Sequence, residues 1–186
     1  TVDGLLHNIG KLFLPQDLLK KTEPLSDAEF ALIKTHPRKG YEAIKNKDLD
    51  PRIKYAVLSH HERCDGSGYP ANLRDNEITS FAKIVAIADT YDAMTSPRIY
   101  RGPLCPFKVV HLFQSEGLSQ YDPHYLLTFL DGTIDAFLHT NVRLSDGQEG
   151  EIVMINRTDL SRPTVKVGDK FINLFNERNL FIESMK

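Results

Sequence analysis

The hydrophobic pattern of the chain changes near residue 140, and this change limits the fold more than any other feature of the sequence. Before it, the pattern predicts helices, several of which begin at a proline, where a helix has no partner for an N–H group. From Asn141 onward, short alternating segments are separated by turn residues, which is typical of strands. The sequence therefore predicts a mainly α protein, with a helical domain over residues 1–139 and a small antiparallel β module over residues 140–186.

The helical part carries start and stop signals. Ser26 and Glu29 have the spacing of a capping box, which predicts that a helix begins there. His36 precedes Pro37, and a residue before proline is driven out of the helical region, so we expect His36 at a kink between two helices. Further helices are predicted over 37–47, 51–61, 106–116 and 123–138, and over an apolar central segment, 82–88, with Asp89 near its end.

The last part of the chain predicts about five short strands. Asp146-Gly147 is a strong hairpin signal between the first two of them. The strands are expected near residues 142–145, 152–155, 164–167, 171–174 and 180–183. So small a set predicts a curled sheet or barrel packed against the helices, and not an independent catalytic domain.

Composition excludes several classes of function. With 23 basic and 25 acidic residues, the net charge is -2, so nothing favours binding to long nucleic acid or to an anionic membrane. No apolar stretch approaches the roughly 20 residues that span a bilayer, and we identify no signal peptide. Cys64 and Cys105 are too few for a disulfide framework, so we expect free thiols and a cytoplasmic protein.

Histidines gather at the predicted helix ends. His60 and His61 are adjacent in the glycine-rich segment HHERCDGSGYP, while His7, His36 and Asp89 lie on either side of it. Imidazoles and carboxylates together suit Zn, Fe or Mn. Because successive helical residues point about 100° apart, the adjacent imidazoles are expected to face two neighbouring ions, or one ion and a phosphate. Two ions would polarise a phosphoryl oxygen and activate a water, which predicts phosphoester hydrolysis.

Five segments together resemble a known family. LLHNIGK, THPRKGY, SHHERCDGSGYP, VAIADTYDAMTS and RIYR occur in the order and approximate spacing of the HD-GYP family, a branch of the HD-domain metal-dependent phosphohydrolases. They span nearly all of residues 4–101. The resemblance implies an HD-domain helical bundle that hydrolyses the bacterial second messenger cyclic di-GMP with two or three metal ions. A homodimer or a fusion with a sensor domain is a further expectation.

The resemblance also implies roles for individual residues. The divalent metal, one or two ions of Fe or Mn with Zn as the alternative, is expected on His7, His36, His60, His61 and Asp89, and Asp89 is also expected to be catalytic. Lys11 looks like the lysine that contacts the scissile phosphate. The loop that lines the substrate groove looks like Gly68, Tyr69 and Pro70, and the cations that orient the diester look like Arg98 and Arg101.

Some of these residues also have a plain structural interpretation. Tyr69 precedes a proline, where an aromatic residue often only shapes a turn, although it could also stack on a guanine. The two arginines could be solvated surface charges. We interpret Asp92 as a surface charge, and His111, His124 and His139 as ordinary histidines outside the site.

The sequence departs from the family's pattern at Asn8. The His-Asp doublet that names the family is His7-Asn8 here, and a neutral amide cannot bridge two metals as the expected aspartate would. The family's further Glu and His ligands, on a preceding helix, have no counterpart, which suggests either a fragment or a reduced site. The leading hypothesis is a phosphodiesterase impaired by Asn8. The alternative is a catalytically degenerate signalling module that binds metal or a cyclic dinucleotide.

Overall fold

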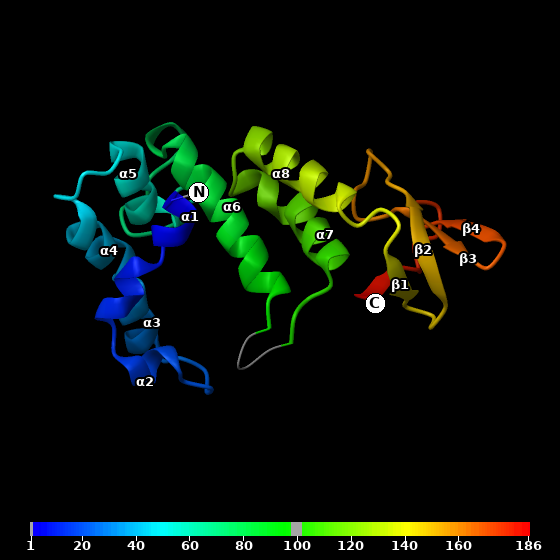
Figure 1. Cartoon of the computed structure of the whole chain (residues 1–186), viewed down its shortest axis with the longest axis horizontal. Coiled ribbons are helices and arrows are strands. Elements are labelled where there is room, and N and C mark those ends of the chain that lie inside the picture. Colours follow the sequence, from blue (N-terminus) through cyan, green and yellow to red (C-terminus); the bar gives the residue numbers. More distant parts are fainter. Residues whose placement is uncertain (1, 98–101) are drawn as a thin grey trace.

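The structure is a computed structural model that describes residues 2–97 and 102–186 (Figure 1). The helices of its N-terminal part are α1 (Val2–Leu6), η1 (Ile9–Phe13), α2 (Gln16–Leu19), α3 (Asp27–Ile33), α4 (His36–Ile44) and α5 (Pro51–Ser59). They are followed by η2 (Asp75–Glu77), α6 (Ser80–Thr95), α7 (Pro106–Glu116), η3 (Gly117–Ser119) and α8 (Pro123–Asp135). The strands are β1 (Asn141–Leu144), β2 (Glu149–Met154), β3 (Thr164–Val167), β4 (Lys170–Asn173) and β5 (Ile182–Met185).

The predicted start signals are confirmed. In the capping box at the start of α3, Glu29 N donates to Ser26 Oγ, and Ser26 N donates to Glu29 Oε2. The helices α5, α7 and α8 each begin with a proline. The predicted break between two helices is present, because α3 ends at Ile33, but His36 is the first residue of α4 and does not lie outside the helix as predicted. The predicted helix ends are too late in three places, since α4 stops at Ile44, α5 at Ser59 and α8 at Asp135.

The central helix α6 is longer than predicted. It continues to Thr95, so Asp89 lies inside the helix and not near its end. No glycine or proline interrupts the chain after Asp89 until Pro97, which drives Ser96 out of the helical region. The helix is buried at Ala82, Val85, Ala86 and Ile87, but Ile84 is 47% exposed, so one face of α6 remains open.

The five strands form one antiparallel sheet in the order β4-β3-β2-β1-β5. The predicted hairpin between β1 and β2 is confirmed: Gly147 has a φ of 88°, a backbone conformation that favours glycine, and its N–H donates to Leu144 O. Of the two predicted shapes, the structure forms an open sheet, in which β4 and β5 are the edge strands.

The sheet and the last helices share one hydrophobic core. Phe107 of α7, together with Leu126 and Ile134 of α8, packs in the same cluster as Val142 and Ile152 of the sheet. Figure 1 shows the sheet beyond α7 and α8, at the far end of the molecule from α4. The predicted packing of the β module against the helices is therefore confirmed, while the division into domains at residue 139 stays a prediction. Among the described helices, none has both the length and the apolar character needed to cross a bilayer.

Candidate metal centre

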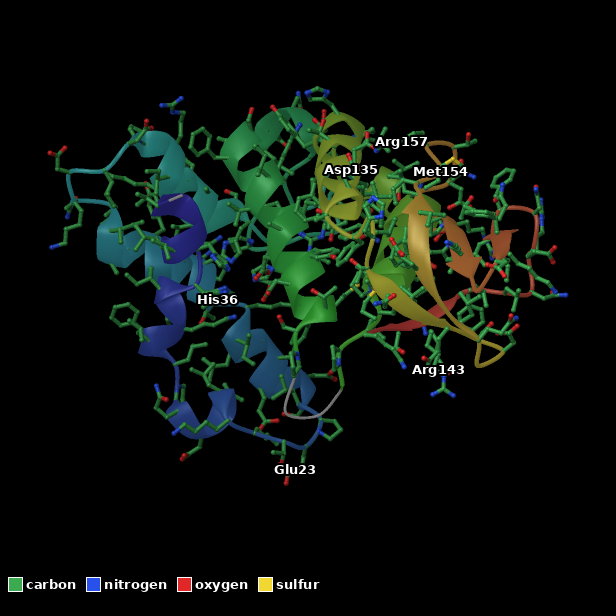
Figure 2. The ribbon with its side chains drawn as sticks, turned by 45° about the vertical axis from the view of Figure 1, so that its right-hand side comes forward. Glu23, His36, Asp135, Arg143, Met154 and Arg157 are labelled. Carbon is green, nitrogen blue, oxygen red and sulfur yellow. The ribbon has the colours of Figure 1, made fainter. Side chains whose placement is uncertain are left out.

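Four separate segments bring the predicted ligands together. His7 follows α1, His36 begins α4, His60 caps the C-terminal end of α5 with His61 next to it, and Asp89 lies within α6. One candidate ligand atom from each of His36, His60 and His61 lies within 4.8 Å of the others. In Figure 2, His36 lies between the N-terminal helices and α6. The chain therefore gathers residues that are more than fifty positions apart in the sequence.

The hydrogen bonds of the imidazoles leave their Nε2 atoms facing one another. His36 Nδ1 is 2.8 Å from Ile33 O, and His60 Nδ1 is 2.9 Å from Val57 O. A carbonyl only accepts, so each Nδ1 carries the proton and donates it to the backbone three residues earlier. The two Nε2 atoms lie 3.3 Å apart. This arrangement is typical of metal-binding histidines, whose other ring N–H is held by a backbone carbonyl.

Burial keeps these imidazoles neutral. It lowers the pKa of His36 to about 4 and that of His60 to about 3. Burial also lowers the pKa of His61, and the neighbouring His60 adds to this effect. Each neutral ring has one N–H, and in His36 and His60 this N–H donates to a backbone carbonyl. The Nε2 atom of each ring therefore carries a lone pair, and the two lone pairs face each other. Two lone pairs at this distance repel unless a cation lies nearby, so the donor set fits a divalent metal ion.

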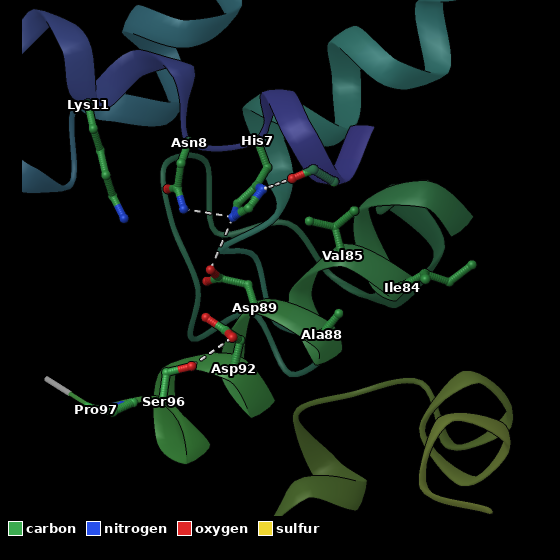
Figure 3. A pocket seen from close by; sticks show the side chains of 11 residues that line it. His7, Asn8, Lys11, Ile84, Val85, Ala88, Asp89, Asp92, Ser96 and Pro97 are labelled. Carbon is green, nitrogen blue, oxygen red and sulfur yellow. Dashed lines mark hydrogen bonds and ion pairs between the residues drawn. The ribbon is translucent and has the colours of Figure 1, made fainter. Parts of the chain in front are cut away.

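His7, Asn8 and Asp89 form a second polar group beside the cluster (Figure 3). His7 Nδ1 donates to Gly4 O at 2.7 Å, and His7 Nε2 lies 3.2 Å from Asp89 Oδ1 and 2.7 Å from Asn8 Nδ2. The ring of His7 is 5.1 Å from that of His60, centroid to centroid. A backbone carbonyl thus holds Nδ1 of His7, as in His36 and His60, but Nε2 of His7 is in contact with Asn8 and Asp89.

The electrostatics of the His7–Asp89 pair follow from its contact. Burial alone would lower the pKa of His7, but the hydrogen bond to Asp89 raises it above its ordinary value. Burial would raise the pKa of Asp89, but the hydrogen bond from His7 and the nearby imidazoles of His61 and His60 hold it well below its usual range. Asp89 is therefore an anion at neutral pH, as a metal-binding carboxylate must be.

Asn8 leaves one buried acceptor unused. Its Oδ1 is buried and accepts no hydrogen bond from the residues that the structure describes. An unpaired buried polar atom of this kind costs about 1 to 3 kcal/mol. It lies beside the predicted ligands, at the position where the family's pattern has the bridging aspartate. An oxygen without a partner here is consistent with a site that completes its contacts when an ion is bound.

A pocket of about 570 Å³ opens beside His7 and Asp89. Lys11 of η1 lines one side of it, and Figure 3 shows its ammonium group extending along the opening. Asp92 of α6 and Ser96, directly after this helix, line the other side, and Ser96 Oγ donates to Asp92 Oδ1 at 2.9 Å. Asp92 is exposed, as predicted, but it also lines this pocket. The pocket joins a cation to the candidate ligands, which suits an anionic substrate.

The loop of residues 68–70 contacts the cluster on another side. The ring of Tyr69 stacks on that of His61, with 4.7 Å between centroids and 20° between planes. Gly68 packs against the backbone of Glu62, where an added Cβ would lie 2.4 Å from Glu62 Cα. None of Gly68, Tyr69 and Pro70 lines the pocket that contains Lys11. Their predicted role in a substrate groove therefore stays a prediction, with a contact to His61 as the observed fact.

Glu62 is a site residue that the sequence analysis missed. Its side chain is buried, and its two carboxylate oxygens accept from Ala71 N at 2.6 Å and from Leu73 N at 3.0 Å. Asn72 Nδ2 also donates to Gly68 O at 2.5 Å. Glu62 thus fixes the loop that carries Tyr69 onto His61. The signal available in the sequence was an acidic residue directly after two histidines. Its hydrogen-bond partners, however, lie nine and eleven residues later in the chain.

The remaining predicted residues fall outside the described site. Arg98 and Arg101 lie outside the described residues. Cys64 and Cys105 are free thiols, as predicted, and burial raises the pKa of Cys64 to about 11. Cys64 is therefore a thiol at neutral pH and a poor nucleophile.

Comparison with known proteins shows the family of the chain. Residues 1–125 match the HD domain family. A cyclic di-GMP phosphodiesterase of Pseudomonas aeruginosa is 33% identical over 165 residues, which cover 88% of this chain and 40% of that protein. A 3'3'-cGAMP-specific phosphodiesterase of Vibrio cholerae is 34% identical over 113 residues, which cover 61% of this chain and 26% of that protein. The chain thus spans less than half the length of these relatives.

A solved structure shows the same fold. Bd1817, an HDG"Y"P protein from Bdellovibrio bacteriovorus, has a TM-score of 0.57 and 20% sequence identity to this chain, and the match covers 71% of this chain and 42% of that one. The chain belongs to the HD domain family and carries an HD-GYP domain.

Proposed function

We propose that the chain is a metal-dependent phosphodiesterase that hydrolyses cyclic di-GMP or a related cyclic dinucleotide. The observation that carries the proposal is the convergence of His36, His60 and His61, with Nδ1 of the first two held by backbone carbonyls and their Nε2 atoms left as donors. The names of the relatives support the substrate class, since both act on cyclic dinucleotides. A homodimer or a fused sensor domain remains a separate prediction.

The residues of the proposed site have separate roles in metal binding and in phosphate binding. One or two ions, Fe or Mn with Zn as the alternative, would be held by His36, His60 and His61, together with His7 and Asp89. When bound, the metal supplies Lewis acidity that polarises a phosphoryl oxygen and makes water more acidic. Asp89 fixes the ring of His7 through the contact at 3.2 Å. Lys11 binds the phosphate as a point charge and stabilises the negative charge that develops on it.

Substrate recognition is assigned to the loop and the arginines. Tyr69 orients His61 through the stacked contact and offers an aromatic surface beside the site, on the loop that Gly68 and Pro70 shape. Arg98 and Arg101 are proposed to orient the diester, because paired cations suit a phosphate. Incubation of the purified chain with cyclic di-GMP and Mn²⁺, followed by chromatography of the products, tests this function. Failure to cleave with any of Mn²⁺, Fe²⁺ and Zn²⁺ would contradict it.

A second function, a binding module without turnover, is favoured by Asn8. Its Nδ2 lies 2.7 Å from His7 Nε2, the nitrogen that His7 would offer to a metal, and its side chain supplies no negative charge. Two divalent ions close together need anionic ligands to offset their repulsion. Such a module would bind a metal ion or cyclic di-GMP and signal to a partner protein whether this ligand is bound.

The variant Asn8→Asp is expected to raise metal content and phosphodiesterase activity together. The added carboxylate restores a negative charge beside His7, so a second ion binds more tightly and activity rises by about 10-fold or more, the scale of single changes around a metal. Metal per chain, measured by elemental analysis, and initial rates with cyclic di-GMP check this. The variant Asn141→Asp, which adds the same charge in β1, is the matched control and should change neither.

Three outcomes separate the two functions. A joint rise in metal and activity supports the enzyme limited by Asn8. An inert Asn8→Asp variant beside an active chain that is extended at its N-terminus shows that residues before the given sequence are required, and it contradicts the role of Asn8. Binding of cyclic di-GMP without turnover in every form, lost in Arg98→Ala, supports the binding module.

A further inference from the structure

Lys34 lies between two aromatic rings at the edge of the metal centre. It caps the C-terminal end of α3, two residues before His36. Its Nζ is 4.6 Å from the centre of the Phe30 ring and 5.3 Å from that of the Tyr69 ring. Contacts of this kind between an ammonium group and an aromatic face are attractive and restrict where the charge can lie. The ammonium of Lys34 is thus held beside Tyr69.

A short series of contacts connects Lys34 to the histidines. Tyr69 stacks on His61, and the ring of His61 is 4.2 Å from that of His60 and 5.0 Å from that of His36. Lys11, by contrast, lines the pocket with His7 and Asp89, and neither Lys34 nor Tyr69 lines that pocket. Lys34 is thus connected to the cluster through Tyr69, outside the pocket that Lys11 lines.

The charge of Lys34 is not offset by a protein carboxylate. No ion pair to Lys34 forms within residues 2–97 and 102–186, although several nearby lysines have one, such as Lys21 with Glu29 at 2.7 Å. Phe30, whose ring contacts Lys34, is 46% exposed. A cation that contacts two aromatic rings and has no ion pair within the described residues suits a ligand that combines phosphate with a flat base.

We propose that Lys34 binds a second phosphate group of the substrate, while Lys11 binds the first. This inference rests on the proposed function and deepens it. Two cations near one metal cluster, only one of which lines the pocket beside His7, match a ligand with two phosphodiester groups, such as a cyclic dinucleotide. A simple diester has only one such group. Lys34 is then a specificity-determining residue, because it is used only by substrates with the second phosphate.

The test compares two substrates on the variant Lys34→Met, which keeps most of the apolar stem over Phe30 and Tyr69 and removes the charge. We expect KM for cyclic di-GMP to rise by about 10-fold, the order of one charge-assisted hydrogen bond, with kcat changed little. For bis(p-nitrophenyl) phosphate, which has a single phosphodiester, KM and kcat should change less than about twofold. Lys34→Arg should restore binding of cyclic di-GMP, and Lys47→Met, at an exposed lysine between α4 and α5, is the matched control.

Two results would overturn the inference. KM for cyclic di-GMP could stay at the value of Lys47→Met, or both substrates could lose activity equally, which would place Lys34 among the residues that only support His61. If the chain hydrolyses neither substrate, the proposed function fails, and Lys34 is then tested by calorimetric titration with cyclic di-GMP. A Kd about 10-fold higher in Lys34→Met supports its role. An equal Kd, or no binding by the unmodified chain, contradicts it.

Discussion

The variant His60→Ala is expected to lose its metal and its phosphodiesterase activity together. His60 has no exposed surface, and its Nε2 is 3.3 Å from that of His36, at the centre of the histidine cluster. Loss of a residue that hydrogen-bonds to a metal ligand usually lowers metal affinity or activity by about 10- to 100-fold, so loss of a ligand itself should lower them further. Metal per chain and initial rates with cyclic di-GMP, measured on the same preparation, check this.

The control for His60→Ala is His124→Ala. His124 is exposed at the start of α8, and its ring contacts only Tyr125 among the described aromatic residues. This control should keep its metal and its activity. A folded His60→Ala protein with full metal content would show that the histidine cluster is not the metal centre.

The variant Glu62→Gln is expected to destabilise the protein and lower its activity. Both oxygens of Glu62 accept from backbone N–H groups, and glutamine can offer only one acceptor and would turn an amide N–H toward the other. We expect the free energy of unfolding to fall by about 2 to 3 kcal/mol, the scale of a lost hydrogen bond to a buried charge. Urea denaturation followed by circular dichroism gives this value.

The loss of activity in Glu62→Gln should follow from the loop. A looser loop no longer holds Tyr69 on His61, so activity should drop by about 10-fold or more, as for other residues that orient ligands. Glu23→Gln, at an exposed glutamate ahead of α3 (Figure 2), should change neither quantity. If Glu62→Gln unfolded at the same urea concentration as Glu23→Gln, the hydrogen bonds of Glu62 to the loop would contribute nothing to the free energy of unfolding.

Local signals explain why much of the fold could be predicted. Pro106 and Glu116 bound α7 as predicted, because a proline at the first turn and the glycine after Glu116 are local in the sequence. The turn at Asp146-Gly147 and the strand at 164–167 were predicted for the same reason. Helix ends were less certain: Asp89 was placed at the end of α6, although the next strong break comes only at Pro97.

The site was predictable only where its residue types are unusual. The adjacent pair His60-His61 and the resemblance of its flanking segments drew attention to the right places in the sequence. Glu62 was missed, because a buried glutamate cannot be told from a surface one until its partners, Ala71 and Leu73, fold back onto it. The contact of Lys34 with Tyr69 joins α3 to a distant loop and has no local signal. Tertiary contacts of this kind decide the chemistry but leave no periodic pattern.

Elemental analysis of the purified chain tests the central claim most directly. The account predicts at least one Fe, Mn or Zn ion per chain, retained through gel filtration and lost in His60→Ala, because one ligand atom from each of three neutral imidazoles lies within 4.8 Å of the others. A folded chain that contains no metal, and takes up none after incubation with Fe²⁺, Mn²⁺ or Zn²⁺, would contradict it.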